Sequence, residues 1–109
     1  RDYIHVVDVA KAHVKAVERL LNQEQENQIE FLNLGTGIGY SVMDVINSFE
    51  KVTDLKLNYE ITDRRAGDVP KLYAATDLAK DKLNWEAKRT LDEMISSSWT
   101  WEQKLRQED

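Results

Sequence analysis

The 109-residue sequence contains no cysteine, which excludes disulfides and cysteine–zinc sites. A chain of this kind is typical of a reducing compartment, so we expect a cytoplasmic protein. No hydrophobic run approaches the length of a membrane span, so we expect no membrane partner. Positive charge is scarce as well, because 15 Lys and Arg residues stand against 20 Asp and Glu, a net charge of −5. That balance argues against a general nucleic-acid-binding protein.

Two motifs of NAD-dependent enzymes are also missing. The glycine run at residues 35–39 leads into a helix-like segment, but Tyr40 stands where the dinucleotide-binding G-x-G-x-x-G pattern needs a glycine. The Tyr-x-x-x-Lys pair of short-chain dehydrogenases is absent, because no tyrosine is followed by lysine four positions later. The residues at those positions are Val7, Asp44, Asp63 and Asp77. We therefore predict no catalytic and no cofactor-binding residue in this chain. The glycine run is interpreted as a tight turn before a helix.

Strand-like and helix-like patterns alternate along the chain, which indicates an α/β or α+β architecture. Sequence patterns predict strands at residues 2–7, 31–34 (buried) and 55–61, and a short extended piece at 72–75. Helical spacing of apolar residues predicts helices at 9–21, from 42 onward, from about 77 to 84, and from 91 to about 104. Asp8 is the expected N-cap of the first helix. The pairs Ser41/Asp44 and Thr90/Glu93 predict capping boxes for the second and the last.

The histidines and tryptophans are expected to have structural roles. His5 should take part in a structural hydrogen bond, and neither histidine is spaced as a metal ligand. His13 is expected in the core, on an apolar face formed with Val9, Ala10, Val17, Leu20 and Leu21. The tryptophans, which lie at positions 85, 99 and 101, are expected to pack rather than to stack on a ligand.

The segment Arg64-Arg65-Ala66-Gly67-Asp68 is the strongest local signal of a ligand site. Guanidinium groups bind phosphate oxygens in bidentate fashion, glycine lets the backbone turn closely around a ligand, and a carboxylate accepts hydrogen bonds from hydroxyls. Such a segment suits a phosphorylated polyhydroxy ligand such as a nucleotide sugar. An arginine pair in a loop is more often solvated surface, so the segment alone does not decide between the two.

Five segments, in chain order, resemble motifs of the UDP-glucose 4-epimerase family. Residues 1–10 resemble that family's R-D-Y-I-H-V-x-D-x-A, and residues 33–42 its N-L-G-x-G-x-G-x-S-V. Residues 64–68 match R-R-x-G-D, residues 91–94 match L-D-E-M, and residues 99–101 match the closing W-x-W. The resemblance runs through nearly the whole chain but covers only the C-terminal third of such an enzyme. Because the chain opens without methionine and inside a strand-like pattern, we expect it to be a piece of a longer parent.

The resemblance implies the fold of an extended short-chain dehydrogenase/reductase, with a Rossmann domain that holds NAD and a smaller α+β domain that binds the UDP-sugar. Residues 1–39 would add an outer helix and strand to the Rossmann domain, and residues 40–109 would form the UDP-sugar-binding domain. The implied reaction interconverts UDP-glucose and UDP-galactose, in galactose metabolism, by hydride removal from C4 to NAD and return to the opposite face. The catalytic pair and the NAD loop belong to the absent N-terminal part, so the chain alone is expected to be inactive. Dimers of the family use helices outside this segment.

The resemblance also assigns binding roles to particular residues. Arg1 and Arg65 match arginines that grip the diphosphate, Asp68 matches an acid that contacts the uridine ribose, and Tyr3 lies beside this site. Leu72 matches a position whose bulk governs whether N-acetylated sugars fit. Since leucine is smaller than the tyrosine of stricter enzymes, the parent is expected to accept UDP-N-acetylhexosamines as well.

Two other functions fit parts of the pattern. A related nucleotide-sugar dehydratase, decarboxylase or uronate epimerase would share the R-D-Y-I-H-V opening, whereas the L-D-E-M and W-x-W motifs favour the 4-epimerase. A stand-alone, non-catalytic nucleotide-sugar-binding module is the second alternative. As a fragment of the 4-epimerase that it resembles, the isolated chain is expected to be marginally stable or self-associating, because its apolar strand would present an unpaired edge.

Overall fold

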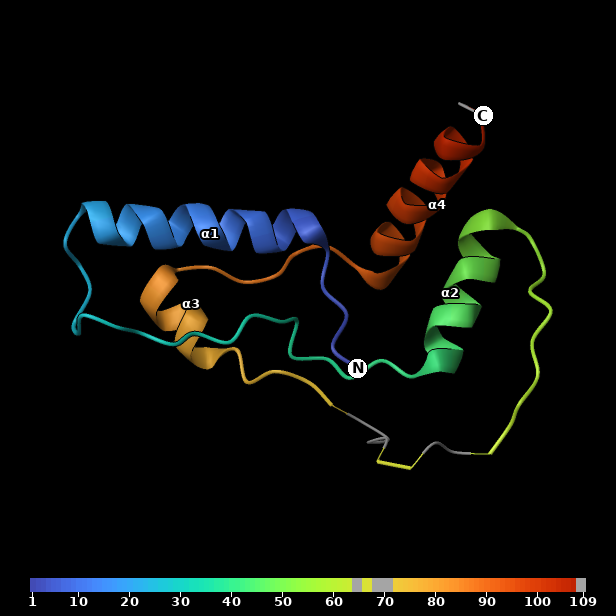
Figure 1. The fold of residues 1–109 in the computed structure, drawn as a ribbon, viewed down its shortest axis with the longest axis horizontal. Helices are drawn as coiled ribbons and strands as arrows, with labels where there is room; N and C mark the ends of the chain where they lie inside the picture. Colours follow the sequence, from blue (N-terminus) through green and yellow to red (C-terminus); the bar gives the residue numbers. More distant parts are fainter. Residues whose placement is uncertain (64–65, 68–71, 108–109) are drawn as a thin grey trace.

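Four α-helices joined by long extended segments make up the described part of the chain. The computed structural model describes residues 1–63, 66–67 and 72–107. The helices are α1 (Val6–Leu21), α2 (Val42–Thr53), α3 (Asp77–Leu83) and α4 (Leu91–Gln107). α1 packs with α3, and α2 packs with α4, so the helices form two pairs at opposite ends of the molecule (Figure 1). None of the helices within the described ranges is both long enough and apolar enough to cross a membrane.

The predicted strands form no ladder among the described residues, none of which is assigned to a strand. Arg1 and Tyr40 make one reciprocal pair of main-chain hydrogen bonds, each with a nitrogen-to-oxygen distance of 2.7 Å. Phe31, expected in a buried strand, is 86% exposed. Extended backbone becomes a strand only when a neighbouring backbone completes its hydrogen bonds, so an apolar pattern alone overestimates strands here.

α1 begins before the predicted start at residue 9, because its N-cap is His5. The imidazole Nδ1 of His5 accepts a hydrogen bond from the N–H of Val7 at 3.0 Å. Asp8 is not the cap but a buried residue of the first turn. Its carboxylate accepts hydrogen bonds from the backbone N–H groups of Lys88 and Arg89, at 3.3 Å and 3.0 Å. The prediction for Asp8 was wrong because its partners lie about eighty residues away, where no local pattern can reveal them.

The core between α1 and α3 is small and is built partly from alanine. Ala12, Ala79, Leu83 and Trp85 are buried together. Partly buried apolar side chains surround them, namely Ile4, Ala16, Leu32, Leu34 and Ala87. Because alanine has a short side chain, Ala12 and Ala79 let the two helices approach closely. The buried stripe of α1 therefore runs through positions 12 and 16.

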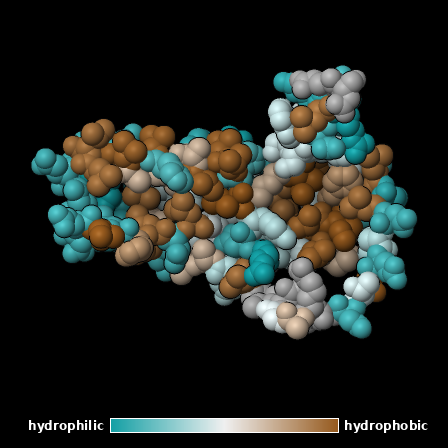
Figure 2. Space-filling model, viewed as in Figure 1, coloured by the Kyte–Doolittle hydropathy of each residue, from teal (hydrophilic) through white to brown (hydrophobic). Residues whose placement is uncertain are grey.

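Most of the larger apolar residues of α1 face outward, contrary to prediction, although Val9 of the predicted face is half-buried. Val14, Val17, Leu20 and Leu21, which we call the outer face of α1, are all exposed. Figure 2 shows apolar side chains gathered over this helix and again between α2 and α4. His13 is exposed too, with its Nδ1 2.8 Å from the carbonyl oxygen of Val9, so its expected place in the core was wrong.

The loop after α1 is fastened to the helices by charged groups. The guanidinium of Arg19 binds the Glu30 carboxylate through two hydrogen bonds, at 2.9 Å and 3.1 Å. Arg19 also donates to the main-chain carbonyl of Lys82 at 3.0 Å, and the ammonium of Lys82 lies 2.6 Å from the carboxylate of Glu26. The bidentate pair of Arg19 and Glu30 therefore fixes the position at which residues 26–30 cross α1 and α3.

Both predicted capping boxes are confirmed. The Ser41 hydroxyl accepts from the N–H of Asp44 at 3.0 Å, while the Asp44 carboxylate accepts from the N–H of Ser41 at 2.8 Å. At the start of α4, the Thr90 hydroxyl accepts from the N–H of Glu93 at 3.2 Å, and the Glu93 carboxylate accepts from the N–H of Thr90 at 3.4 Å. These reciprocal bonds satisfy N–H groups that the helix itself leaves unpaired.

α2 and α4 join through one aromatic and one polar contact. The rings of Phe49 and Trp99 meet edge to face, with centroids 5.3 Å apart and planes at 83°. The Asp92 carboxylate accepts hydrogen bonds from the ammonium of Lys51 at 2.7 Å and from the hydroxyl of Ser48 at 2.6 Å. The hydrogen bond from Lys51, followed by that from Ser48, lowers the pKa of Asp92.

Candidate functional site

The carboxylate of Asp2 joins three segments that are far apart in the sequence. Its Oδ1 accepts hydrogen bonds from the N–H and the hydroxyl of Thr36, at 2.8 Å and 2.6 Å. Its Oδ2 accepts from the N–H groups of Gly37 and Ala74, at 2.9 Å and 3.1 Å. These bonds hold the segment that carries Arg1 against the glycine turn and against the segment that follows Leu72.

The environment of Asp2 favours the ionised carboxylate. Partial burial raises its pKa by desolvation, but the four hydrogen bonds act in the opposite direction. Among the hydrogen bonds, the one from the Thr36 hydroxyl lowers the pKa most, followed by those from the N–H groups of Thr36, Ala74 and Gly37. Together they outweigh the desolvation, so the pKa of Asp2 is lowered. A charged acceptor with four donors makes stronger hydrogen bonds than a neutral one, so the three segments are firmly tied.

A hollow of about 370 Å³ opens beside this junction. Its lining combines a cation, a carboxylate that already accepts four hydrogen bonds from the chain, and apolar, amide and phenol groups, namely Arg1, Asp2, Asn33, Leu34, Leu72, Tyr73 and Ala74. A guanidinium can bind a phosphate group, and apolar side chains can cover the face of a ring. The lining is therefore suited to a ligand with an anionic part and a ring.

The structure brings together two of the predicted site residues, Arg1 and Leu72, on this one hollow. Tyr3 is exposed and is not among the described residues that line it. Arg65 and Asp68 lie outside the described residues, so their predicted roles stay predictions. Between them Gly67 has φ of +82°, in the left-handed region, as its interpretation as a turn glycine requires.

The glycine turn is a structural turn and not a dinucleotide cradle. Gly37 has φ of +79°, and the N–H groups of Thr36 and Gly37 both point at the Asp2 carboxylate. A Cβ on Gly35 would lie 2.5 Å from Oδ2 of Asp2, closer than side-chain atoms approach one another. Since Asp2 occupies the place where an anionic ligand would sit, these N–H groups are not free to bind a phosphate of NAD.

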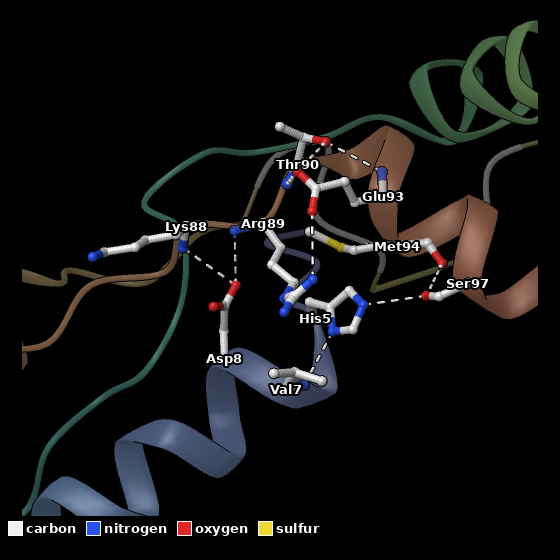
Figure 3. A network of polar contacts seen from close by, with 9 residues as sticks. All are labelled: His5, Val7, Asp8, Lys88, Arg89, Thr90, Glu93, Met94 and Ser97. Carbon is white, nitrogen blue, oxygen red and sulfur yellow. Dashed lines mark hydrogen bonds and ion pairs between the residues drawn. The ribbon is translucent and has the colours of Figure 1, made fainter.

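A second polar network ties the start of α1 to α4 and to residues 85–89 (Figure 3). Besides its carboxylate contacts, Asp8 accepts a hydrogen bond on its main-chain oxygen from the indole N–H of Trp85, at 2.9 Å. The predicted packing role of Trp85 is thus confirmed, since the indole is both buried and hydrogen-bonded. The network fixes α1 relative to the segment that leads into α4.

His5 connects this network directly to α4, and its predicted structural hydrogen bond is confirmed. Because Nδ1 accepts from Val7, the proton of the ring lies on Nε2, which faces the hydroxyl of Ser97 at 3.2 Å. The Ser97 hydroxyl in turn donates to the carbonyl of Met94 at 3.1 Å. The ring is buried and is held between the start of α1 and α4 (Figure 3).

No group of three or more His, Asp or Glu side chains that could hold a metal ion occurs in the described part of the chain. The residue that sequence reasoning missed is Asp2, for which no role was predicted. No sequence signal links position 2 to positions 36 and 74, because the contacts form only when the chain folds.

No family model matches the sequence. It is 48% identical over 102 residues to UDP-glucose 4-epimerase of Drosophila melanogaster, a match that covers 94% of this chain and 29% of that enzyme. The crystal structure of UDP-glucose 4-epimerase from Bifidobacterium longum in complex with NAD+ and UDP matches with a TM-score of 0.84 and 42% identity, over 95% of this chain and 30% of that one. The UDP-Glc/GlcNAc 4-epimerase of Campylobacter jejuni matches with a TM-score of 0.82 and 33% identity, over 95% and 31%.

These matches define the class as extended short-chain dehydrogenase/reductases with a Rossmann fold, which confirms the predicted fold class. They also explain the missing strand pairs, because the chain spans only 29–31% of the length of these relatives. Within this class the chain is similar to the C-terminal part of UDP-glucose 4-epimerases, which confirms the resemblance inferred from its motifs.

Proposed function

We propose that the chain is the UDP-sugar-binding part of a cytoplasmic UDP-glucose 4-epimerase that interconverts UDP-glucose and UDP-galactose with NAD. The observation that carries this proposal is the match over 95% of the chain to an enzyme crystallised with NAD+ and UDP. The hollow beside Arg1 and Leu72 supports it, because a cation and an apolar wall suit a nucleoside diphosphate.

We propose a division of the chain near residue 39. Residues 1–39 add α1 and the following extended segment to the Rossmann domain of the parent, and residues 40–109 form the smaller substrate domain. The exposed outer face of α1 and the exposed Phe31 support this division, since in a longer parent both can be covered by the sheet. The homodimer of the parent would form through helices outside this chain, which light scattering of the full-length enzyme would test.

The chain contributes binding and orientation, and the hydride chemistry belongs to the rest of the parent. NAD, held by the N-terminal domain, would accept and return the hydride at C4. Arg1 would bind an oxygen of the diphosphate, with Tyr3 beside the nucleotide, while Arg65 and Asp68 would bind the diphosphate and the ribose. The chain on its own is inactive in this proposal.

Substitution of Arg1 tests the proposal in the full-length parent. Arg1→Ala removes a charge-assisted hydrogen bond to phosphate, so we expect the Kd for UDP in calorimetry to rise by about tenfold or more. Arg106→Ala is the matched control, because Arg106 is an exposed arginine of α4 that does not line the hollow; it pairs with Glu102 and lies over the ring of Trp99 on the same helix. Equal Kd values for wild type and Arg1→Ala would contradict the assigned role.

The activity of the wild-type parent discriminates the functions. Interconversion of UDP-glucose and UDP-galactose supports the proposal. Turnover of another nucleotide sugar without epimerisation at C4 would favour the related dehydratase, decarboxylase or uronate epimerase. Binding of UDP with no turnover of any kind would favour the non-catalytic module.

We also propose that the parent accepts UDP-N-acetylhexosamines, because Leu72 lines the hollow and is smaller than tyrosine. A similar chain, the UDP-Glc/GlcNAc 4-epimerase of Campylobacter jejuni, shows by its name that both sugars occur as substrates among relatives. Leu72→Tyr should abolish turnover of UDP-GlcNAc and retain turnover of UDP-glucose. The control is Leu105→Tyr, on an exposed position of α4. No turnover of UDP-GlcNAc by the wild type would end this proposal.

A further inference from the structure

Three segments must come together to form the hollow that carries Arg1 and Leu72, and no helix spans them. Arg1 is fixed on its main chain by Tyr40, through the reciprocal 2.7 Å hydrogen bonds. Leu72 follows an undescribed stretch of chain and precedes Ala74, the nearest residue on that side with a main-chain hydrogen bond to Asp2. The carboxylate of Asp2 bonds both sides of this junction, the glycine turn and Ala74.

The distances show how Asp2 sets the spacing of the hollow. One residue separates Leu72 from Ala74, whose N–H lies 3.1 Å from Oδ2. Arg1 is covalently attached to Asp2. A single carboxylate, a rigid planar group, therefore connects the cation on one wall of the hollow to the apolar side chain on the other.

The same carboxylate is held from its other edge, so it cannot shift to follow either wall. Oδ1 accepts hydrogen bonds from the N–H and the hydroxyl of Thr36. Besides its bond from Ala74, Oδ2 accepts a second hydrogen bond from the N–H of Gly37. Gly35 packs against it so closely that any side chain there would meet Oδ2 and the Cβ of Ala74, at 2.5 Å and 2.8 Å. The contacts with the glycine turn therefore hold the Asp2 carboxylate in one position.

We propose that Asp2 is a positioning residue of the UDP-sugar site, which sets the distance between Arg1 and Leu72 and acts on the ligand through these two residues. The proposal rests on the proposed function and names a residue that acts on its binding step. Loss of the carboxylate lets the two walls separate, so the ligand binds more weakly, whereas the hydride chemistry, which belongs to other residues, proceeds at its usual rate once the ligand is bound.

The test uses Asp2→Asn in the full-length parent. Asparagine keeps the shape but turns one acceptor oxygen into a donor NH₂, which then faces N–H groups instead of bonding them. We expect the Kd for UDP and the KM for UDP-galactose to rise in parallel by about tenfold, with kcat within about twofold of wild type.

Asp8→Asn is the matched control, because Asp8 also accepts backbone N–H groups of a distant segment but does not line the hollow. We expect it to lower Tm and to leave the KM for UDP-galactose unchanged. A KM within twofold of wild type for Asp2→Asn, or an equal rise in KM for both variants, would overturn the positioning role.

If Asp2→Asn does not fold, Thr36→Val decides the question, since it removes one hydrogen bond from Oδ1 and leaves the three backbone donors. A rise of about two- to threefold in the Kd for UDP at unchanged kcat supports the proposal, and an unchanged Kd overturns it. The failure of the proposed function is a separate outcome, because then the wild-type parent itself binds no UDP.

Discussion

At the scale of the residue, the structure is organised by carboxylates that bond distant backbone. Asp2 accepts from residues 36, 37 and 74, and Asp8 accepts from residues 88 and 89. Both replace hydrogen bonds that a sheet would otherwise provide. These contacts could not be predicted from the sequence, because an aspartate in an extended or first-turn position has the same local pattern whatever it later bonds.

The lowered pKa of Asp2 predicts how its contribution to stability depends on pH. In the folded chain the pKa lies below the ordinary value of 3.8, so the stabilisation is fully present above that value and is lost as the pH falls through the folded pKa. We expect the difference in Tm between wild type and Asp2→Asn, in the full-length parent, to be constant from pH 8 to about 5 and to narrow below about pH 4. Differential scanning calorimetry at these pH values checks this, and a difference that widens in acid would contradict it.

At the scale of the element, local signals located the helices but not the faces that they bury. The Ser41 and Thr90 capping boxes predicted the starts of α2 and α4, because every group in a capping box lies within three residues. The buried face of α1 was predicted wrongly. Its longer apolar side chains, such as Val17 and Leu20, face outward while Ala12 faces the core, because the small Ala79 of α3 leaves room for a close approach at that point of α1.

The edge-to-face pair of Phe49 and Trp99 should be the main apolar link between α2 and α4. We expect Trp99→Ala to lower the free energy of unfolding by about 2 kcal/mol, since the ring is half-buried, and a double-mutant cycle with Phe49→Ala to give a coupling of about 1 kcal/mol. Urea unfolding of the full-length parent measures both.

The control for this pair lies two residues further on. Trp101 is 57% exposed and its ring has a lysine ammonium, that of Lys104, 5.8 Å from its centroid. Trp101→Ala should change the free energy of unfolding by no more than about 0.5 kcal/mol. An equal loss at both positions would mean that the α2–α4 contact is not the source of the effect.

At the scale of the whole molecule, the described chain is thin and expanded. Its extents are 51 × 38 × 22 Å and its radius of gyration is 17.4 Å. A compact domain of this length has a radius of gyration of about 13 Å. Few apolar side chains are buried, and many large ones, among them the outer face of α1, Phe31 and Ile61, are exposed. The shape is that of one part of a larger fold, in agreement with the 29–31% of the relatives that the chain spans.

We therefore expect the isolated chain to self-associate or to unfold at low temperature. Sedimentation at several concentrations should show an average mass that rises with concentration, because the exposed apolar surface is buried between copies. Val17→Lys together with Phe31→Lys should reduce this association, whereas Lys substitutions at the exposed positions Gln103 and Gln107 of α4 should not. A monomeric mass with a sharp thermal transition that does not depend on concentration would contradict this expectation.

The contact between Gly35 and Asp2 has a consequence for how this sequence can change over time. A side chain at position 35 would collide with the carboxylate at position 2, and removal of the carboxylate would leave donors in the turn without an acceptor. A side chain at position 35 is therefore tolerable only after both Asp2 and the backbone near Ala74 change. Two residues 33 positions apart in the chain are thereby bound to a shared evolutionary path.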